Sequence, residues 1–258
     1  MSPFSQHEYQ VRCEWGLAGA REITRDAAIT AVVDVLSFTT TLTVAADRGV
    51  AVFPYPWRDS TAAEFARSND AVLAVGRSRA GFGEVSLSPE TVRSADGLSR
   101  LVLPSPNGAT IARAVARTGS QVIGVSLRNA KAAAAWTVGR LATMGLGSPV
   151  TVIAAGEQWA DGALRPAIED LWGAGAFIEA LAASMERSTP EVLSPEARGA
   201  VAAYRDVAPE LPGRLHDCAS GRDLVASGFA GDVEVAGEVD QSDVVPVLHD
   251  AVFRTAPP

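Results

Sequence analysis

Short runs of β-branched and apolar residues alternate along the chain with longer, alanine-rich segments. We expect strands in the apolar runs, at residues 29–36, 50–55, 71–75, 101–104, 121–125 and 149–155. We expect helices between and after them, at residues 39–48, 59–68, 109–118, 129–143 and 167–184. This alternation predicts an α/β fold in which a mainly parallel or mixed sheet carries helices on both faces.

The pattern changes after residue 190, where helical segments follow one another. A helix is expected at 194–207 with Ser194 as its N-cap, and a shorter one at 220–229 that ends at Gly228. No low-complexity linker and no repeat interrupts the chain, so we interpret residues 1–258 as a single domain. A sub-domain boundary near residue 190 stays open.

Two further segments complete the expected organisation. The run VVPVL at 244–248 is expected to return as an edge strand, because Pro246 has no N–H to donate to a neighbouring strand. Residues 77–100 are expected to form a long polar loop, and loops of that length are often functional.

Composition narrows the functional classes. Apolar residues make up 47% of the chain, enough for a large core, and the net charge of −8 disfavours binding to a nucleic-acid backbone. No apolar run approaches the ~18–20 residues that cross a bilayer, so no membrane partner is expected. Residues 1–15 lack a basic stretch followed by an apolar one, and only two cysteines occur, which favours a cytoplasmic protein.

Several common catalytic motifs are missing from the sequence. The three histidines lack metal-ligand spacing, and neither C-x-x-C nor H-E-x-x-H occurs, which disfavours a zinc site. Lys131 is the only lysine and follows no glycine-rich loop, so a P-loop is excluded. Neither the dinucleotide-binding G-x-G-x-x-G after a strand nor the G-x-S-x-G of serine hydrolases occurs.

Polar residues gather instead just after four expected strands, at 34–41, 103–110, 124–129 and 155–162. In open α/β sheets ligands bind beyond the carboxyl ends of the strands. Three of these junctions place Ser, Thr or Asn where a helix begins, and helix N-termini bind phosphate through their free amides. Thr39 and Thr40 are therefore candidates for phosphate binding, and Arg128 is a candidate for a bidentate clamp. Ordinary helix capping explains the same residues at any one junction.

Carboxylates are expected along the same edge of the sheet, at Asp34, Glu157, Asp161, Glu169 and Asp170. Together with a phosphate pocket they suggest a hard cation such as Mg²⁺, which prefers oxygen ligands. Asp34 is the most telling of them, because a carboxylate within a buried apolar strand costs several kcal/mol unless it is paired or metal-bound.

The order of these motifs resembles the 2-phosphosulfolactate phosphatase family. The similar stretches are VVDVLSFTTTLTVAADRGV at 32–50, SPNGATIARAV at 105–115, VSLRNAKAAA at 125–134, the segment 154–178 and the segment 220–248. The resemblance implies a three-layer α/β/α fold, a homodimer, and Mg²⁺-dependent hydrolysis of 2-phospho-3-sulfolactate to 3-sulfolactate and phosphate in coenzyme M biosynthesis.

The resemblance also implies roles for individual residues. Asp34 and Asp170 become metal-binding and catalytic carboxylates, with Glu169 beside Asp170 as a further catalytic candidate. Asn107, Gly108 and Asn129 become candidates for binding phosphate or substrate, and Asp240 is a further acidic candidate.

The chain departs from the family pattern at three places. Ser37 stands where the family usually has arginine, and Arg77 stands where it usually has an acid. Ser105 and Pro106 stand where the family has two threonines before Asn-Gly. We expect Arg77 to take over anion binding. Two other hypotheses stay open: a catalytically altered or silent protein that binds small anions on the same fold, and a haloacid-dehalogenase-type phosphatase with Asp34 as nucleophile. Leu36 occupies the position where that second class carries another acid.

Overall fold

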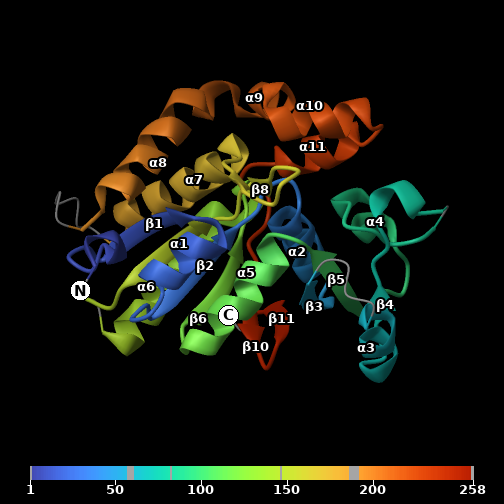
Figure 1. Ribbon diagram of the computed structural model, residues 1–258, viewed down its shortest axis with the longest axis horizontal. Coiled ribbons are helices and arrows are strands. Elements are labelled where there is room, and N and C mark those ends of the chain that lie inside the picture. The colour runs from blue at the N-terminus through green and yellow to red at the C-terminus, as the bar shows by residue number, and fades with distance from the viewer. Residues whose placement is uncertain (1, 57–60, 82, 146, 186–191, 257–258) are drawn as a thin grey trace.

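A computed structural model describes residues 2–56, 61–81, 83–145, 147–185 and 192–256 (Figure 1). Within these residues, nine strands form one mixed sheet in the order β1-β7-β2-β6-β10-β11-β3-β5-β4. Their bounds in that order are Val11–Trp15, Val150–Ala154, Ile29–Val33, Gln121–Val125, Pro246–His249, Val252–Thr255, Ala51–Pro56, Arg100–Ser105 and Val72–Leu73.

The sheet consists of two parallel groups that run in opposite directions. β1, β7, β2 and β6 are parallel to one another, as are β3, β5 and β4. The antiparallel hairpin β10–β11 joins the groups, pairing with β6 through Val247 and with β3 through Phe253. The edge-strand prediction for residues 244–248 is therefore wrong. Pro246 is tolerated inside the sheet because it is the first residue of its strand.

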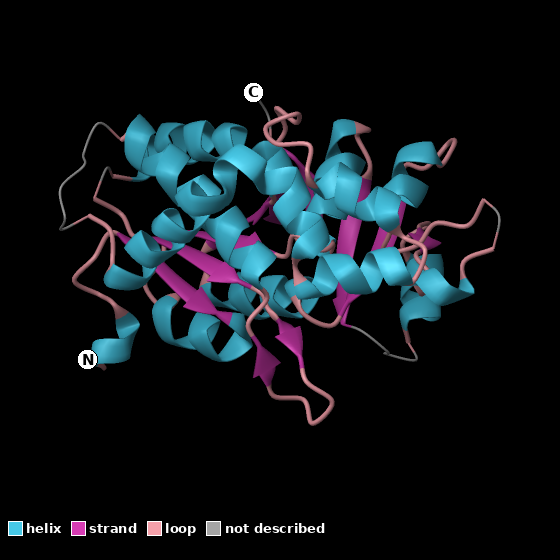
Figure 2. Cartoon of the chain, turned by 90° about the horizontal axis from the view of Figure 1, so that it is seen from above, coloured by secondary structure: helices cyan, strands magenta, loops and turns pink. Residues whose placement is uncertain are grey.

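Helices cover both faces of the sheet, which confirms the three-layer α/β/α prediction (Figures 1 and 2). Neighbouring strand residues alternate between the faces: Val32 belongs to one hydrophobic core, and Val33 to the other. One face packs against α1 (Gly16–Ile23), α2 (Phe38–Asp47) and α5 (Gly108–Val115). The other packs against α6 (Ala130–Met144), α7 (Ile168–Ser184), α8 (Pro195–Val207) and, over β3 and β5, α3 (Ala62–Ser68).

The expected helices 39–48, 109–118, 129–143, 167–184 and 194–207 form close to their predicted limits, with Ser194 capping α8. Residues 59 and 60 of the expected helix 59–68 lie outside the described residues. No helix among the residues described is long and apolar enough to cross a membrane.

Several elements were not expected from the sequence. Residues 77–100 are not all loop, because they contain the 3₁₀ turn η2 and helix α4. After α8 the chain forms α9 and α11, and between them lies α10, which is the helix expected at 220–229 and ends two residues before Gly228. These helices arch over the top of the molecule in Figure 1. A two-stranded hairpin, β8–β9, follows β7 in the chain. The bounds are Arg77–Arg79 for η2, Pro89–Ser94 for α4, Leu211–Asp217 for α9, Ala219–Ala226 for α10, Ala230–Ala236 for α11, and Glu157–Gln158 and Leu164–Arg165 for β8 and β9.

The strand register determines where polar loops meet. Val33 of β2 pairs with Val125 of β6 and with Ala154 of β7, so these three strands end side by side. Asp34 follows β2 directly and therefore lies next to the chain that leaves β7 at residue 155. The candidate site lies at this edge.

Candidate active site

Asp34 connects the end of β2 with the first turns of two helices. Its Oδ1 accepts a hydrogen bond from the Phe38 amide at 3.1 Å, and its Oδ2 accepts one from the Gly108 amide at 2.9 Å. These amides begin α2 and α5, so two positive helix ends stabilise one carboxylate. The side chain is almost fully buried, as its position after an apolar strand predicts.

Asp170, in the first turn of α7, is bound by backbone amides in the same way. Its Oδ1 accepts from the Val35 amide at 2.7 Å and its Oδ2 from the Gly156 amide at 2.8 Å. These bonds attach α7 to the loops that follow β2 and β7. The structure therefore brings Asp34 and Asp170, 136 positions apart in the sequence, into one buried site.

Burial first, and then the charges of neighbouring acids, raise the pKa values of these carboxyl groups. Burial, reinforced by the negative charge of Glu157, raises the pKa of Asp34 to about 7. Burial, followed by the charges of Asp34 and Glu169, raises the pKa of Asp170 well above its ordinary value. The amide hydrogen bonds act in the opposite direction and only partly offset these effects. The site is thus an electrostatically unbalanced acidic cluster, of the kind common at functional sites.

Glu169 adds a buried acidic atom to this cluster. Its side chain is 2% exposed, and its Oε2 has no hydrogen-bond partner in the described part of the chain. Buried polar atoms are nearly always hydrogen-bonded, so an orphaned carboxylate oxygen calls for an explanation. Cys218 lies beside it, and burial together with the Glu169 charge raises the pKa of this thiol to about 12. Cys218 is therefore a protonated thiol at neutral pH.

Asn107 and Glu157 form the more open side of the site. The Asn107 Nδ2 donates to Glu157 Oε2 at 2.9 Å, which links the start of α5 with β8. Burial raises the pKa of Glu157, and the Asn107 hydrogen bond and the Arg165 charge partly offset this rise. Both residues line a cavity of about 290 Å³ between the hairpin β8–β9 and the start of α1.

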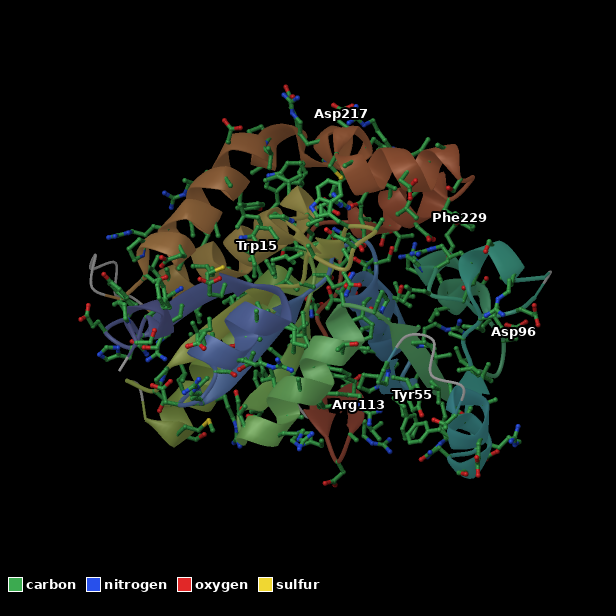
Figure 3. All side chains as sticks on the ribbon, in the orientation of Figure 1. Trp15, Tyr55, Asp96, Arg113, Asp217 and Phe229 are labelled. Carbon is green, nitrogen blue, oxygen red and sulfur yellow. The ribbon has the colours of Figure 1, made fainter. Side chains whose placement is uncertain are left out.

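Arg77 lies near enough to Asp34 for its charge to lower the pKa of that carboxyl, but it is already paired with another acid. Its Nη2 donates to Ser37 Oγ at 2.5 Å, and its Nε donates to Asp232 Oδ2 at 2.8 Å. Asp232 is completely buried and also accepts a hydrogen bond from Ser88 Oγ. The guanidinium carbon lies 5.9 Å from the centre of the Phe229 ring, which is labelled in Figure 3. Arg77 thus joins α11 to the loop that carries Ser37.

The remaining predicted residues make structural contacts. Thr39 Oγ1 donates to the backbone oxygen of Asp34, and Thr40 Oγ1 donates to that of Val35, so both hydroxyls shape the turn into α2. The other predicted residues have partners away from Asp34: Arg128 pairs with Asp47 and Glu238, Asn129 caps the turn at Ser126 and donates to Gly124 and Val244, and Asp240 pairs with Lys131.

Two residues beside the cluster are not among the site residues predicted from the sequence. Arg165 and Ser220 are in hydrogen-bond contact at 3.1 Å, and Arg165 is paired with Glu157 across the β8–β9 ladder. The hairpin is only two residues long on each side, too short for a pattern of alternating residues to predict it. Asp161, at its exposed end, does not join the buried carboxylates.

Known proteins are similar to this chain over most of its length. The sequence model of the family described as 2-phosphosulpholactate phosphatase matches residues 19–251. The chain belongs to this family. It is also 31% identical over 225 residues to a probable 2-phosphosulfolactate phosphatase of Thermus thermophilus, a match that covers 86% of this chain and 88% of the relative. Membership in the 2-phosphosulpholactate phosphatase family makes the chain a phosphatase that acts on a phosphate monoester.

Proposed function

We propose that this family member is a Mg²⁺-dependent phosphatase whose substrate is 2-phosphosulfolactate or a similar small, doubly anionic phosphate ester. One observation carries the proposal: Asp34 and Asp170 are buried together, and backbone amides from three separate loops hold all four of their oxygens. Such fixed carboxylates are preorganised for a ligand of opposite charge. A homodimer and a place in coenzyme M biosynthesis stay predictions from the family resemblance.

The residues of the site fit a magnesium ion. The described part of the chain contains no group of three or more His, Cys, Asp or Glu side chains arranged to hold a metal. Mg²⁺ does not need such a cage, since it is commonly bound through one or two carboxylates together with water and substrate phosphate. Asp34 and Asp170 would supply those carboxylates, and the orphaned Oε2 of Glu169 supports the need for a nearby cation. When bound, the ion would neutralise charge on the phosphoryl oxygens.

The chain's own residues would then perform the remaining steps. The hydrogen bonds from backbone amides keep the carboxylates of Asp34 and Asp170 in their orientation. Glu157 is the more exposed carboxylate, and its raised pKa makes it a stronger base than an ordinary glutamate, which suits a group that accepts a proton from water. Asn107 holds the Glu157 carboxylate in position. Direct attack of a carboxylate on phosphorus stays the alternative chemistry for the same site.

Phosphate release from 2-phosphosulfolactate tests this proposal. We expect release with Mg²⁺, loss of release in EDTA, and recovery when Mg²⁺ is added back. Asp34→Asn should lower kcat at least a hundredfold, because the amide cannot supply the negative charge that the cation requires. Asp96→Asn is the matched control: Asp96 is an exposed acid on a distant loop (Figure 3), and its loss should leave kcat unchanged.

Three results would contradict the proposal. Phosphate release that persists in EDTA would show that the reaction needs no metal ion. Full activity of Asp34→Asn would show that this carboxylate is not required for catalysis. Binding of the ester without any release of phosphate would favour the silent anion-binding protein instead. Trapped phosphate on Asp34 would identify it as the nucleophile.

A further inference from the structure

Arg165, the last residue of β9, is a cation whose side chain forms a hydrogen bond and a ring contact with neutral groups. Its Nη2 donates to Ser220 Oγ at 3.1 Å, and its guanidinium carbon lies 5.8 Å from the centre of the Trp159 ring. It forms no ion pair with any acid among the described residues. Its side chain is partly exposed, so a ligand from solvent can reach it.

The position of Arg165 is notable because an acid lies directly across the ladder. Glu157 and Arg165 are paired residues in β8–β9, yet the Glu157 Oε2 accepts its hydrogen bond from Asn107. Arg165 instead turns to Ser220, in the first turn of α10. Its charge still acts on Glu157 at a distance, which places the guanidinium beside the acidic cluster.

Arg77 is another arginine beside the cluster. It differs from Arg165 because its guanidinium is paired with an acid. Arg77 is neutralised by Asp232, which is completely buried and cannot exchange its partner for a ligand without leaving a buried charge. Arg165 contacts a neutral hydroxyl and an aromatic ring. A substrate that carries a second anionic group has to place it against a positive charge, because the rest of the site is acidic.

We propose that Arg165 is a specificity-determining residue, which together with the Ser220 hydroxyl binds the second acidic group of the substrate, a carboxylate or a sulfonate. A planar guanidinium donates two parallel hydrogen bonds to such a group. The hydroxyl of Ser220 at the start of α10 supplies a third donor. This inference rests on the proposed function, since it names the residues that bind the acidic group of that substrate which does not react.

Two phosphate esters that differ in one group provide the test. In 2-phosphoglycerate a carboxylate stands where glycerol 2-phosphate has a neutral hydroxymethyl group. We expect Arg165→Gln to lower the ratio of kcat/KM for 2-phosphoglycerate to kcat/KM for glycerol 2-phosphate at least tenfold, chiefly through a higher KM for 2-phosphoglycerate. Arg165→Lys should restore part of the ratio, because it returns the charge without the bidentate geometry.

Arg113→Gln is the matched control. Arg113 also stacks on an aromatic ring, that of Tyr55 at 5.3 Å, and Figure 3 shows this pair far from Phe229 and the helices above it. Its substitution should leave the ratio unchanged. An unchanged ratio in Arg165→Gln, or an equal fall in Arg113→Gln, would overturn the assignment of Arg165.

A binding measurement separates this inference from the proposed function. If the wild-type protein releases phosphate neither from these two esters nor from 2-phosphosulfolactate, the proposed function fails. Calorimetric titration with 3-sulfolactate, which has no phosphate to release, then still decides the role of Arg165. We expect Arg165→Gln to weaken this binding at least tenfold relative to wild type and to Arg113→Gln. Equal binding by Arg165→Gln, or no binding by wild type, would refute the inference.

Discussion

At the scale of single residues, Gly108 is a position where the site tolerates no side chain. A Cβ at this position would overlap Phe38 Cδ1 and would lie 2.7 Å from Asp34 Oδ2, well inside contact distance. Gly108→Ala should therefore push α5 away from Asp34 and lengthen the amide hydrogen bond. We expect it to lower the free energy of unfolding by about 1–3 kcal/mol and to reduce kcat, as measured by urea denaturation and phosphate release.

Gly139→Ala is the control for this substitution. Gly139 lies in α6, and a Cβ at this position would meet no atom of the described residues within 4 Å, so alanine fits there. Alanine also restricts the unfolded chain and favours the helix, which should raise stability by about 0.5–1 kcal/mol without changing kcat. Equal effects of the two substitutions on kcat would show that Gly108 has no special relation to Asp34.

Some of these residue contacts could be predicted from the sequence and others could not. Asp34 was predictable, because a carboxylate at the end of an apolar strand needs a partner or a ligand. The partner of Arg77 was not, since Asp232 lies 155 positions away and on a helix that no pattern singled out. Long-range ion pairs depend on how the elements pack, which the sequence shows only indirectly.

At the scale of elements, the alternation of strands and helices predicted most of the sheet. β2, β3, β5, β6 and β7 lie within one or two residues of their expected starts. The position of β10 could not be predicted, because its proline is compatible with an edge or with the first residue of an inner strand. The reversal between the two parallel groups depends on this hairpin, so it was missed as well.

The pair Arg77–Asp232 connects α11 to the chain beside α2, and it leads to a prediction at this scale. Asp232 is completely buried, whereas Arg77 keeps 18% of its side chain exposed. Asp232→Ala leaves a largely buried guanidinium without its partner, which should cost about 3–5 kcal/mol of stability. We expect thermal and urea unfolding to report this loss.

Glu179→Ala provides the comparison, because Glu179 pairs with Arg205 on the surface at a similar distance, 2.6 Å. Arg205 keeps 67% of its side chain exposed, so solvent screens the pair and its loss should cost about 0.2–1 kcal/mol. If Asp232→Ala cost no more than Glu179→Ala, the connection between α11 and the site would contribute little to the fold.

For the molecule as a whole, the acidic cluster makes stability depend on pH. Asp34 has a pKa of about 7 in the folded protein against an ordinary value of 3.8, so between these values the folded state binds more protons than the unfolded state. Unfolding then releases protons, and the free energy of unfolding falls as pH rises through this range. Asp26 and Glu238, whose carboxyls have lowered pKa values, act in the opposite direction only in more acidic solution.

Urea unfolding in EDTA between about pH 6 and pH 8 isolates this effect from the groups that titrate in acid. Wild type should lose about 1–2 kcal/mol more stability over that range than Asp34→Asn, because asparagine carries no proton to release. Mg²⁺ added near pH 8 should return stability to wild type, since an ion that binds only the folded state stabilises it by mass action. The same addition should have little effect on Asp34→Asn. Parallel pH profiles of the two proteins would mean that Asp34 is charged at neutral pH, and the electrostatic reason for a cation at this site would be lost.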